Sequence, residues 1–583
     1  MPKRGRLASA VVGCIAGMAI GGGCSDEPSP PPALKPVAVA ARAGLSFEFS
    51  IARPSRSWTA FRKLSGASGA LLPSTPAIAL ATFGGLPLEM VRTLVPEAPI
   101  RGVGGSVGDQ QQLLVALPVV SGAELVARLT TGKNVRYTET VEPKSGLIQL
   151  RSLDSPLVVG VLDDSLLLSP SAAAIAYFGE YLVRGVRSKH TSDADIRVVA
   201  PESALNEVVV PLLRQLWISK KTGLLLADRL ARSQAGRAPD FAEPAQLVAV
   251  IGAVVESGLR TLSASSSLAL ELSVDALGAE IALSLQPKPG SAVRELRKSM
   301  ALGPMRELLQ LPQEASVALM LRAEPEGRAA LGTEFAAKLT ALLGDRIGAV
   351  PRNRIELAVA GVMLAVSDVS LLGAVELPDR RRGLFFQTQV PKSVGFTEAV
   401  SKVVSLLEIG ALRAPIESHW GPFQLRSVDP GAERLGGVDL VRKRTAKFQP
   451  VPVQIRFGVP KPGTAGLVVL SEQSDSVARL LGAPALAGGA DLGSDPLFAA
   501  AAASLGNSVN TALIVRMTGP GGDSELTRLL LSWGAAGENL SLRLFVSESA
   551  LLGLARQLFA PGGPSTAAPP PASAGSTAPA PPP

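Results

Sequence analysis

One short motif in the chain has the residue types of a catalytic serine site. Gly104-Gly105-Ser106-Val107-Gly108 fits the G-x-S-x-G pattern, in which a strand leads into the nucleophile and a helix follows it. Here residues 96–103 are typical of a loop, and residues 109–112 lead directly into a strand that begins at Leu113. We therefore interpret the motif as a Gly-rich hairpin loop. A serine hydrolase that uses Ser106 is the least favoured function.

The chain contains two histidines, and spacing identifies no catalytic partner for either. His190 lies in a polar stretch and is interpreted as a surface residue. His419 adjoins Trp420 in a loop expected at 417–421, where an edge-of-core position is favoured over ligand binding. Lys221-Thr222-Gly223 matches the K-T-G of penicillin-binding proteins, but no S-x-x-K accompanies it.

Metal and redox chemistry have little support in the composition. Asp193 and Asp195 lack the glycine and glutamate of a calcium loop, so we interpret them as a solvated turn. The chain has only two cysteines, which excludes zinc clusters and disulfide scaffolds. No cofactor or metal is therefore expected.

Two basic clusters are the candidate anion-binding sites. Arginine forks suit phosphate and carboxylate groups, so contact with anionic lipid or a cell-wall polymer is one interpretation. Solvated hairpin turns are the alternative, and the favoured one. The clusters are Arg380, Arg381 and Arg382 in one, and Arg442, Lys443 and Arg444 in the other.

The first segment of the chain has the pattern of a secretion signal. Lys3, Arg4 and Arg6 precede an uncharged, largely apolar stretch at 7–20, and three glycines then lead into Cys24. This arrangement resembles the lipobox of bacterial lipoproteins, although Gly21 stands where Leu is common. The resemblance implies that Cys24 is lipidated and becomes the first residue of a membrane-anchored protein.

Two alternatives to lipidation at Cys24 remain. Cys14, preceded by Val11, Val12 and Gly13, fits the four-residue box better but leaves only about seven apolar residues before it. An ordinary cleaved signal with an incidental cysteine is the other alternative. If Cys24 is lipidated, both cysteines are accounted for, and no free thiol remains for catalysis.

Composition places the rest of the chain among globular proteins. Hydrophobic residues make up 46% and charged residues 18% of the 583, too apolar for a disordered chain. Removal of residues 1–23 reduces the net charge from +8 to +5, which gives nucleic-acid binding little support. The segments expected are a signal at 1–23, a Pro-rich tether at 24–40, two α+β halves at 41–305 and 306–560, and a disordered Pro/Ala-rich tail at 561–583.

A strand, a proline and a helix recur in the same order seven times. Proline cannot donate to a sheet ladder and its fixed φ suits the first turn of a helix, so it ends a strand and begins a helix. The predicted strands are 45–51 before Pro54, 113–117 before Pro118, 196–199 before Pro201, 281–285 before Pro287, 317–321 before Pro325, 385–390 before Pro391 and 513–517 before Pro520.

Several landmarks pair across the chain at a nearly constant offset, which indicates an internal duplication. The pairs are Pro54 with Pro325 (271), Pro118 with Pro391 (273), 149–154 with 424–429 (275), 78–84 with 355–361 (277) and 166–169 with 468–471 (302). The growth of the offset places an insertion near 442–461. The architecture resembles secreted bacterial lipoproteins grouped as families of unknown function, which implies no activity.

The predicted fold class is α+β, with two tandem related domains of largely antiparallel sheets and packed helices. Short turns at 163–164 and 276–278 separate paired strands and indicate hairpins. We expect a non-enzymatic cell-envelope lipoprotein, facing the periplasm or the exterior, that binds an envelope protein, lipid or cell-wall component. The alternative is a carrier of a lipid or other hydrophobic ligand.

Overall fold

The computed structural model describes most of the chain between residues 39 and 552. The described ranges are 39–64, 72–84, 86–131, 137–141, 146–151, 157–186, 194–234, 244–343, 349–377, 381–388, 393–429, 435–442, 453–459, 465–482, 490–518 and 526–552. The expected signal, Cys14, Cys24 and the tail at 561–583 lie outside these ranges, as does the tether apart from residues 39 and 40.

The first part of the chain contributes ten strands and the helices between them. The strands are β1 (Leu45–Ile51), β2 (Ile100–Val107), β3 (Gln110–Pro118), β4 (Thr138–Val141), β5 (Ile148–Arg151), β6 (Val158–Leu162), β7 (Ser165–Ser169), β8 (Ile196–Pro201), β9 (Ser265–Val274) and β10 (Gly278–Pro287). The helices are α2 (Pro54–Leu64), α4 (Pro76–Gly84), α5 (Leu88–Val91), α6 (Gly122–Thr130), α7 (Ala172–Glu180), η1 (Tyr181–Gly185), α8 (Glu202–Ala204), η3 (Leu205–Val209), α9 (Val210–Gln234) and α10 (Pro244–Ser263).

The second part contributes ten more strands. These are β11 (Ala315–Arg322), β12 (Val369–Glu376), β13 (Arg382–Thr388), β14 (Phe423–Val428), β15 (Leu435–Arg442), β16 (Val453–Gly458), β17 (Gly466–Ser471), β18 (Val509–Thr518), β19 (Leu526–Ala536) and β20 (Asn539–Ser547). The helices are α11 (Ala292–Ser299), α12 (Arg306–Leu309), α13 (Pro325–Leu343), α14 (Ala349–Ala365), α15 (Ser393–Ser405), η5 (Leu406–Glu408), α16 (Gly410–Trp420), α17 (Ser474–Gly482), η6 (Leu492–Ser494) and α18 (Pro496–Leu505).

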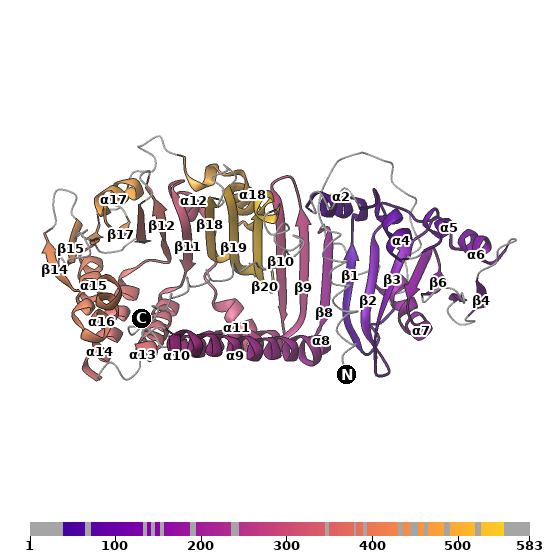
Figure 1. Cartoon of the computed structure of the whole chain (residues 1–583), viewed down its shortest axis with the longest axis horizontal. Helices are drawn as coiled ribbons and strands as arrows, with labels where there is room; N and C mark the ends of the chain where they lie inside the picture. Colours follow the sequence, from indigo (N-terminus) through magenta and orange to yellow (C-terminus); the bar gives the residue numbers. More distant parts are fainter. Residues whose placement is uncertain are drawn as a thin grey trace, which may run out of the picture.

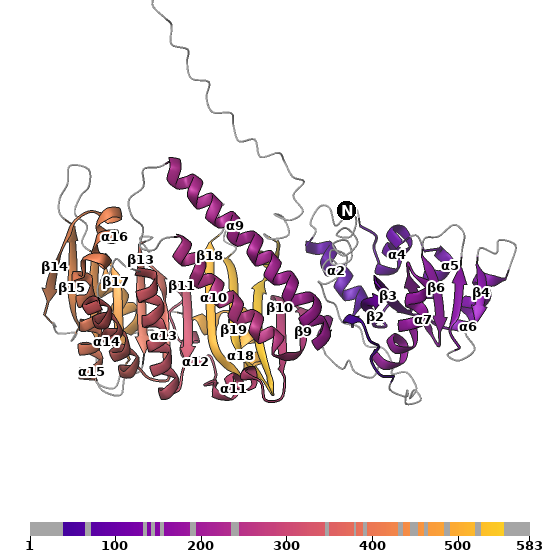
Figure 2. The ribbon, with the colours of Figure 1, turned by 90° about the horizontal axis from the view of Figure 1, so that it is seen from below.

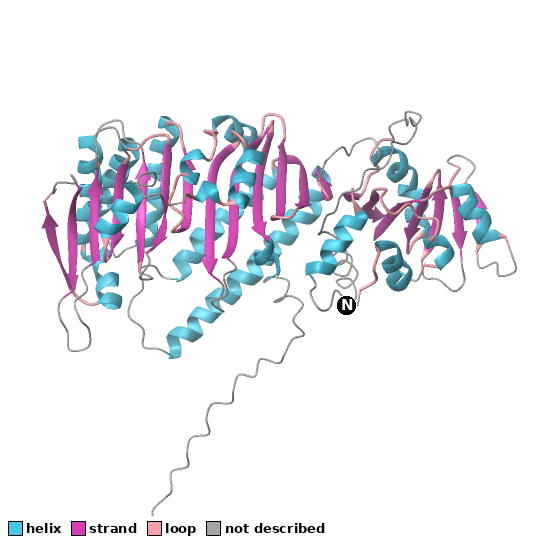
Figure 3. Cartoon of the chain, turned by 90° about the horizontal axis from the view of Figure 1, so that it is seen from above, coloured by secondary structure: helices cyan, strands magenta, loops and turns pink. Residues whose placement is uncertain are grey.

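Within the described ranges the twenty strands form one antiparallel sheet that runs the length of the molecule (Figures 1 and 3). The first ten strands pair in the order β4-β5-β6-β7-β3-β2-β1-β8-β9-β10. The second ten pair in the order β14-β15-β16-β17-β13-β12-β11-β18-β19-β20. Strands β10 and β20 join the two sets. The predicted α+β class with antiparallel sheets is confirmed.

The two sets of strands have the same order, so each strand of the first has a counterpart ten strands later. The offset of 271 between Pro54 and Pro325 agrees with the matching of β1 with its counterpart β11. The two prolines begin α2 and α13, the helices that follow these strands. The match of 166–169 with 468–471 likewise places β7 on β17. The match of 149–154 with 424–429 is wrong, because it places β5 on β14, which is the counterpart of β4.

Six of the seven predicted units contain a described strand followed by a helix, but Pro118, Pro201 and Pro287 are the last residues of their strands and do not themselves begin a helix. Helices begin at Pro54 and Pro325, and α8 begins directly after Pro201. The seventh unit is wrong: the next described element after Pro520 is strand β19, where a helix was expected. Both expected hairpins are present, β6–β7 and β9–β10.

The longest helical insertion among the described residues is the hairpin of α9 and α10. It lies between β8 and β9, whereas their counterparts β18 and β19 are separated only by residues 519–525. The hairpin runs along the lower side of the molecule in Figure 1, and in Figure 2, seen from below, it crosses in front of the central strands. Helix α10 contacts β9 at its base and α13 of the second half. An element of the first half thereby packs on the second.

Candidate functional site

Ser106 does not occupy a nucleophile elbow. It lies inside β2, and strand β3 follows it through a tight turn, where the motif requires a helix. The Ser106 hydroxyl accepts a hydrogen bond of 2.7 Å from the Gln111 side chain, and its backbone N–H donates to Gly44 at 2.8 Å. These contacts place Ser106 in an ordinary hairpin position.

The glycines of this motif belong mainly to a strand, so the expected loop at 96–103 and the Gly-rich hairpin loop are partly wrong. A Cβ on Gly102 would lie 2.0 Å from the Phe49 ring, and one on Gly104 would lie 2.3 Å from the Phe47 ring. Glycine is required at these positions because aromatic rings of β1 lie directly over the β2 backbone. Only Gly108, with a φ of 59°, has the conformation of a turn glycine.

The other sequence-predicted residues are dispersed. His190 lies outside the described residues, and residues 221–223 lie in the interior of α9. The loop expected at 417–421 is wrong, because α16 continues through His419 and Trp420 and ends at Gly421, whose φ is 91°. The described residues contain no group of three or more His, Cys, Asp or Glu side chains that could hold a metal ion.

The two basic clusters lie at the same end of the sheet. Arg382 begins β13, and Arg442 ends β15, with β17 and β16 between them in the sheet. Three strand spacings separate the two strands by about 14 Å. Arg381 is 3.6 Å from Glu472. Arg380, Lys443 and Arg444 lie outside the described residues, so anion binding by these clusters stays a prediction.

Asp195 is buried, and the expected solvated turn is wrong at this residue. Its side chain is only 1% exposed and accepts a hydrogen bond of 2.8 Å from the backbone N–H of Val274. Arg53 lies 2.9 Å from the same carboxylate and Arg56 lies 3.8 Å from it. Arg56 also donates to the carbonyl of Val274. Asp195 therefore ties the beginning of β8 to the end of β9 and to the first turn of α2.

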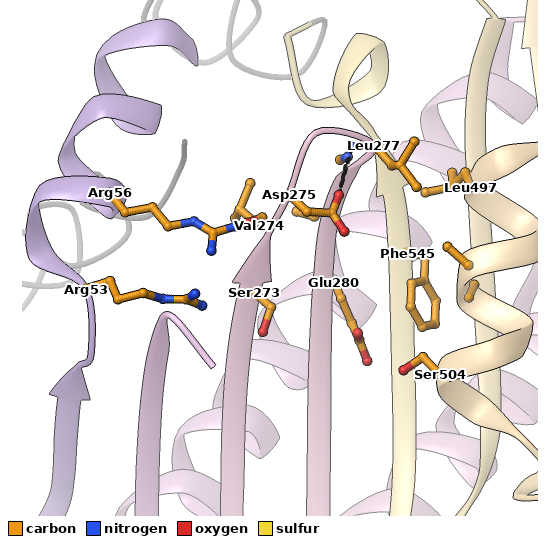
Figure 4. A pocket seen from close by; sticks show the side chains of 14 residues that line it. Arg53, Arg56, Ser273, Val274, Asp275, Leu277, Glu280, Leu497, Ser504 and Phe545 are labelled. Carbon is orange, nitrogen blue, oxygen red and sulfur yellow. Dashed lines mark hydrogen bonds between the residues drawn. The ribbon is translucent and has the colours of Figure 1, made fainter. Parts of the chain in front are cut away.

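These arginines form one wall of a pocket at the junction of the two halves (Figure 4). The pocket has a volume of about 200 Å³ and is lined by residues from α2, the β9–β10 hairpin, α18 and β20. Glu280 lies in the middle of the view, and Ser504 and Phe545 lie opposite the arginines. The pocket is small for a ligand site, since typical ligand pockets hold roughly 300–1,000 Å³.

The charges of this pocket are largely paired. Burial raises the pKa of Glu280 above its usual value, and the Arg543 guanidinium, 3.1 Å away, lowers it in part. Arg543 also donates to Ser504 at 3.2 Å. Because Glu280 lies on β10 and Arg543 on β20, their ion pair crosses the junction. The arrangement can hold the two halves together through ion pairs, and its described lining contains no histidine or cysteine.

An apolar surface lies on the other side of the central strands from this pocket. Directly paired residues of antiparallel strands point to the same side of a sheet. One row of such pairs crosses β9, β10, β20, β19, β18 and β11 in turn, and every residue in it is apolar. The row is Leu272, Ile281, Leu544, Leu531, Leu513 and Leu319. We call this side of the six strands the apolar face.

Neighbouring rows extend the apolar face without introducing a charge. The next row consists of Leu270, Leu283, Leu542, Trp533, Thr511 and Leu321. On the opposite side of the same strands, Ala318, Ile514 and Phe545 belong to a buried core together with residues of α12 and α18. Helices therefore cover one side of the central strands much more completely than the other.

The apolar face is half-buried to exposed in the middle of the sheet. Leu270, Val317 and Leu321 are exposed, and Met517 is 52% exposed. At one end, Leu272 packs against a buried cluster that includes residues of α4, α5 and α6. Beyond the other end, α15 packs with β13, β16 and β17 in a second cluster. The uncovered part spans six strands, about 24 Å from first to last. Exposed apolar patches of this extent mark binding surfaces on soluble proteins.

The signal for this surface was present in the alternation of each strand. Leu268, Leu270 and Leu272 alternate with other residues in β9, as do Leu540, Leu542 and Leu544 in β20. The local patterns do not reveal that strands so far apart in the chain are neighbours, because only the tertiary pairing of β10 with β20 brings them together. Among the described helices, none is long and apolar enough to cross a membrane. No protein-family model, curated protein or solved structure matches this chain.

Proposed function

We propose that this chain is a lipid-anchored, non-enzymatic protein of the bacterial cell envelope that binds hydrophobic ligands, above all lipid acyl chains, on its apolar face. The observation that supports this most is the uncovered row of apolar side chains across the junction of the two halves. Full burial of a large aliphatic side chain is worth about 1.5–3 kcal/mol, and the half-buried side chains of the row still lack part of that free energy. A ligand that covers the row recovers that free energy.

The dimensions of the apolar face suit an acyl chain. The uncovered row is about 24 Å long, whereas one leaflet of a bilayer, and hence one acyl chain, spans about 15 Å of hydrocarbon. The face carries hydroxyl groups at its margins, such as Thr511, and no charged side chain within the two rows. An extended hydrocarbon can lie across the strands without burying a charge.

The expected lipid anchor at Cys24 would hold this face close to a source of such ligands. The strand position of Ser106 favours a binding role over hydrolysis, because a nucleophile elbow needs a helix directly after the serine.

The test uses the unacylated Cys24→Ser protein and a fluorescent long-chain fatty acid. We expect saturable binding, and lipids recoverable by extraction of the purified protein. Met517→Gln and Leu321→Gln, both at exposed positions of the face, should each weaken binding about tenfold, since each places a polar amide against the hydrocarbon.

Leu296→Gln is the matched control. Leu296 is 46% exposed on α11 and does not belong to the apolar face, so binding should not change. Absence of saturable binding, or equal affinities for all three variants and the parent protein, would contradict the proposal.

A further inference from the structure

The pocket at the junction of the two halves has room for a molecule of about amino-acid size. Its volume of about 200 Å³ equals roughly seven water molecules, since each water occupies about 30 Å³ of liquid. The pocket lies on the side of the central strands that faces α18, opposite the apolar face. A ligand in this pocket would therefore be separate from a hydrocarbon bound on the apolar face.

One row of directly paired residues forms the floor of the pocket. Ser273 of β9 pairs with Glu280 of β10, and Glu280 pairs with Phe545 of β20. Their side chains therefore point to the same side of the sheet, at strand spacings of about 4.8 Å. Across the floor, a hydroxyl group is followed by a carboxylate and then by an aromatic ring, over a distance of about 10 Å.

The walls of the pocket follow the same order as its floor (Figure 4). Arg53 and Arg56, at the start of α2, reach in from the end where Ser273 lies. Leu497 of α18 lies at the other end, on the same side as Phe545. A line across the pocket thus passes guanidinium groups first, then a carboxylate, and then apolar side chains.

The ionisable residues that line the pocket balance one another. Arg53 and Arg56 supply positive charge, and Asp275 and Glu280 supply an equal negative charge. A ligand with a net charge would upset this balance in a partly enclosed site, where an uncompensated charge is costly. A zwitterion brings one charge of each sign and leaves the balance unchanged.

The charged groups of the pocket stay accessible although each contacts a neighbour. The side chains of Arg53 and Arg56 are 44% and 25% exposed, although both contact Asp195. Glu280 is 25% exposed, and Arg543 donates to its Oε1 at 3.1 Å. Among the described residues, Oε2 of Glu280 has no hydrogen-bond partner. This oxygen can therefore accept a hydrogen bond from a ligand.

We propose that this pocket binds a free α-amino acid with a small apolar side chain. The ligand carboxylate lies against the guanidinium groups of the two arginines, which suit carboxylates because their N–H groups match the two oxygens. The ligand ammonium group donates to Glu280, and the ligand side chain packs against Leu497 and Phe545. An α-amino acid carries these three groups on one carbon atom, as the order of groups across the pocket requires.

Isothermal titration calorimetry of the unacylated Cys24→Ser protein with L-valine measures this binding. We expect saturable binding with a Kd below about 1 mM. Isovalerate lacks the ammonium group of valine, and isobutylamine lacks its carboxylate. Each of these two compounds should bind at least about tenfold more weakly than valine, because each brings a net charge and loses one charge-assisted contact.

A matched pair of variants on α18 tests the location. Ala500 lines the pocket and is exposed, so Ala500→Phe should fill the space and abolish valine binding. Ala499 is also exposed on α18 but does not line the pocket, so Ala499→Phe should leave valine binding unchanged. Both variants should keep the circular dichroism spectrum and the urea midpoint of the parent protein.

The assignment is overturned if the parent protein shows no saturable valine binding below about 1 mM. It is also overturned if isovalerate or isobutylamine binds as tightly as valine, or if the two alanine variants weaken binding equally. Fatty-acid binding is measured in parallel and should be the same for Ala500→Phe and the parent protein. The two sites fail separately, because valine binding without fatty-acid binding contradicts only the proposed function, and the reverse contradicts only this inference.

Discussion

At the scale of single residues, Asp195 is the most consequential polar side chain. It is buried, and its charge is balanced by Arg53 from a segment more than 140 positions earlier in the chain. Asp195→Asn should lower the free energy of unfolding by about 1–3 kcal/mol, since it leaves the guanidinium without its carboxylate in a site only partly open to water. Urea denaturation measures the change. Asp163→Asn, at an exposed ion pair with Arg184, should cost less than about 1 kcal/mol, and equal losses would contradict the argument.

We expect Tyr181 to make the free energy of unfolding depend on pH in the alkaline range. Burial raises the pKa of Tyr181 above its usual value, and the hydrogen bond that its hydroxyl donates to Glu48 raises it further. The folded state therefore favours the neutral phenol, whose contribution is complete below a pH of about 10 and declines as the pH rises above that value. The free energy of unfolding, measured from pH 8 to 11, should fall more steeply for the parent protein than for Tyr181→Phe. Parallel profiles would show that Tyr181 does not carry the effect.

Local sequence patterns do not reveal why a residue is needed when its partners lie on other elements. Asp195 lies in a polar stretch of the sequence, which suggested a solvated turn. The stretch alone does not show that its partners come from β9 and from the start of α2. Gly102 and Gly104 suggested a loop, because glycine marks turns when no neighbour in space is known. The Phe47 and Phe49 rings that require these glycines lie on another strand.

At the scale of elements, the repeat itself predicts what can be removed. Replacement of residues 202–264 by a seven-residue turn would join β8 directly to β9, as residues 519–525 join β18 to β19. We expect a folded protein that unfolds cooperatively, with less helical signal in far-UV circular dichroism. Some stability should be lost, because the deletion removes the buried side chains of Val248 and Leu259. An insoluble or non-cooperative product would show that the hairpin is part of the folding core.

Alternation and proline predicted several of the described elements, because both act locally. A period-2 pattern identifies a strand such as β1 whatever it later pairs with, and Pro54 and Pro325 begin helices through their fixed φ. The predictions failed where tertiary pairing overrides the local pattern. A strand begins at Leu526 although helix-like polar residues precede it, since pairing with β18 and β20 decides its conformation.

At the scale of the whole molecule, the junction of β10 and β20 should make the two halves unfold together. Eight residue pairs cross this junction, together with the ion pairs of Arg543 with Glu280 and of Lys63 with Glu548. Trp58 in the first half and Trp533 in the second provide a probe for each. In single-tryptophan variants, fluorescence should report the same urea midpoint from both positions. Midpoints separated by more than about 0.5 M would mean that each half is an independent folding unit.

The duplication was visible in the sequence, but its assembly was not. Offsets between landmarks such as Pro54 and Pro325 indicate two related units, since a repeated fold keeps its turns. Nothing local marks β10 and β20 as neighbours, and the apolar face exists only once they pair. The candidate surface was therefore beyond sequence reasoning: residues 270–274, 281–285, 317–321 and 513–517 were predicted as strands, but β19 and β20, which carry Leu531, Leu542 and Leu544, were not.

Strand β20 is the last of the described strands to be synthesised, and it lies at the centre of the sheet, where it pairs with β10. The edge of β10 stays unpaired until roughly 250 further residues have been made. At about 5–20 residues per second, that interval is on the order of 10–50 s. During this time a nascent chain would present an open strand edge bordered by leucines, the kind of surface that recruits other strands. Shielding of the β10 edge until β20 has been made would prevent such pairing.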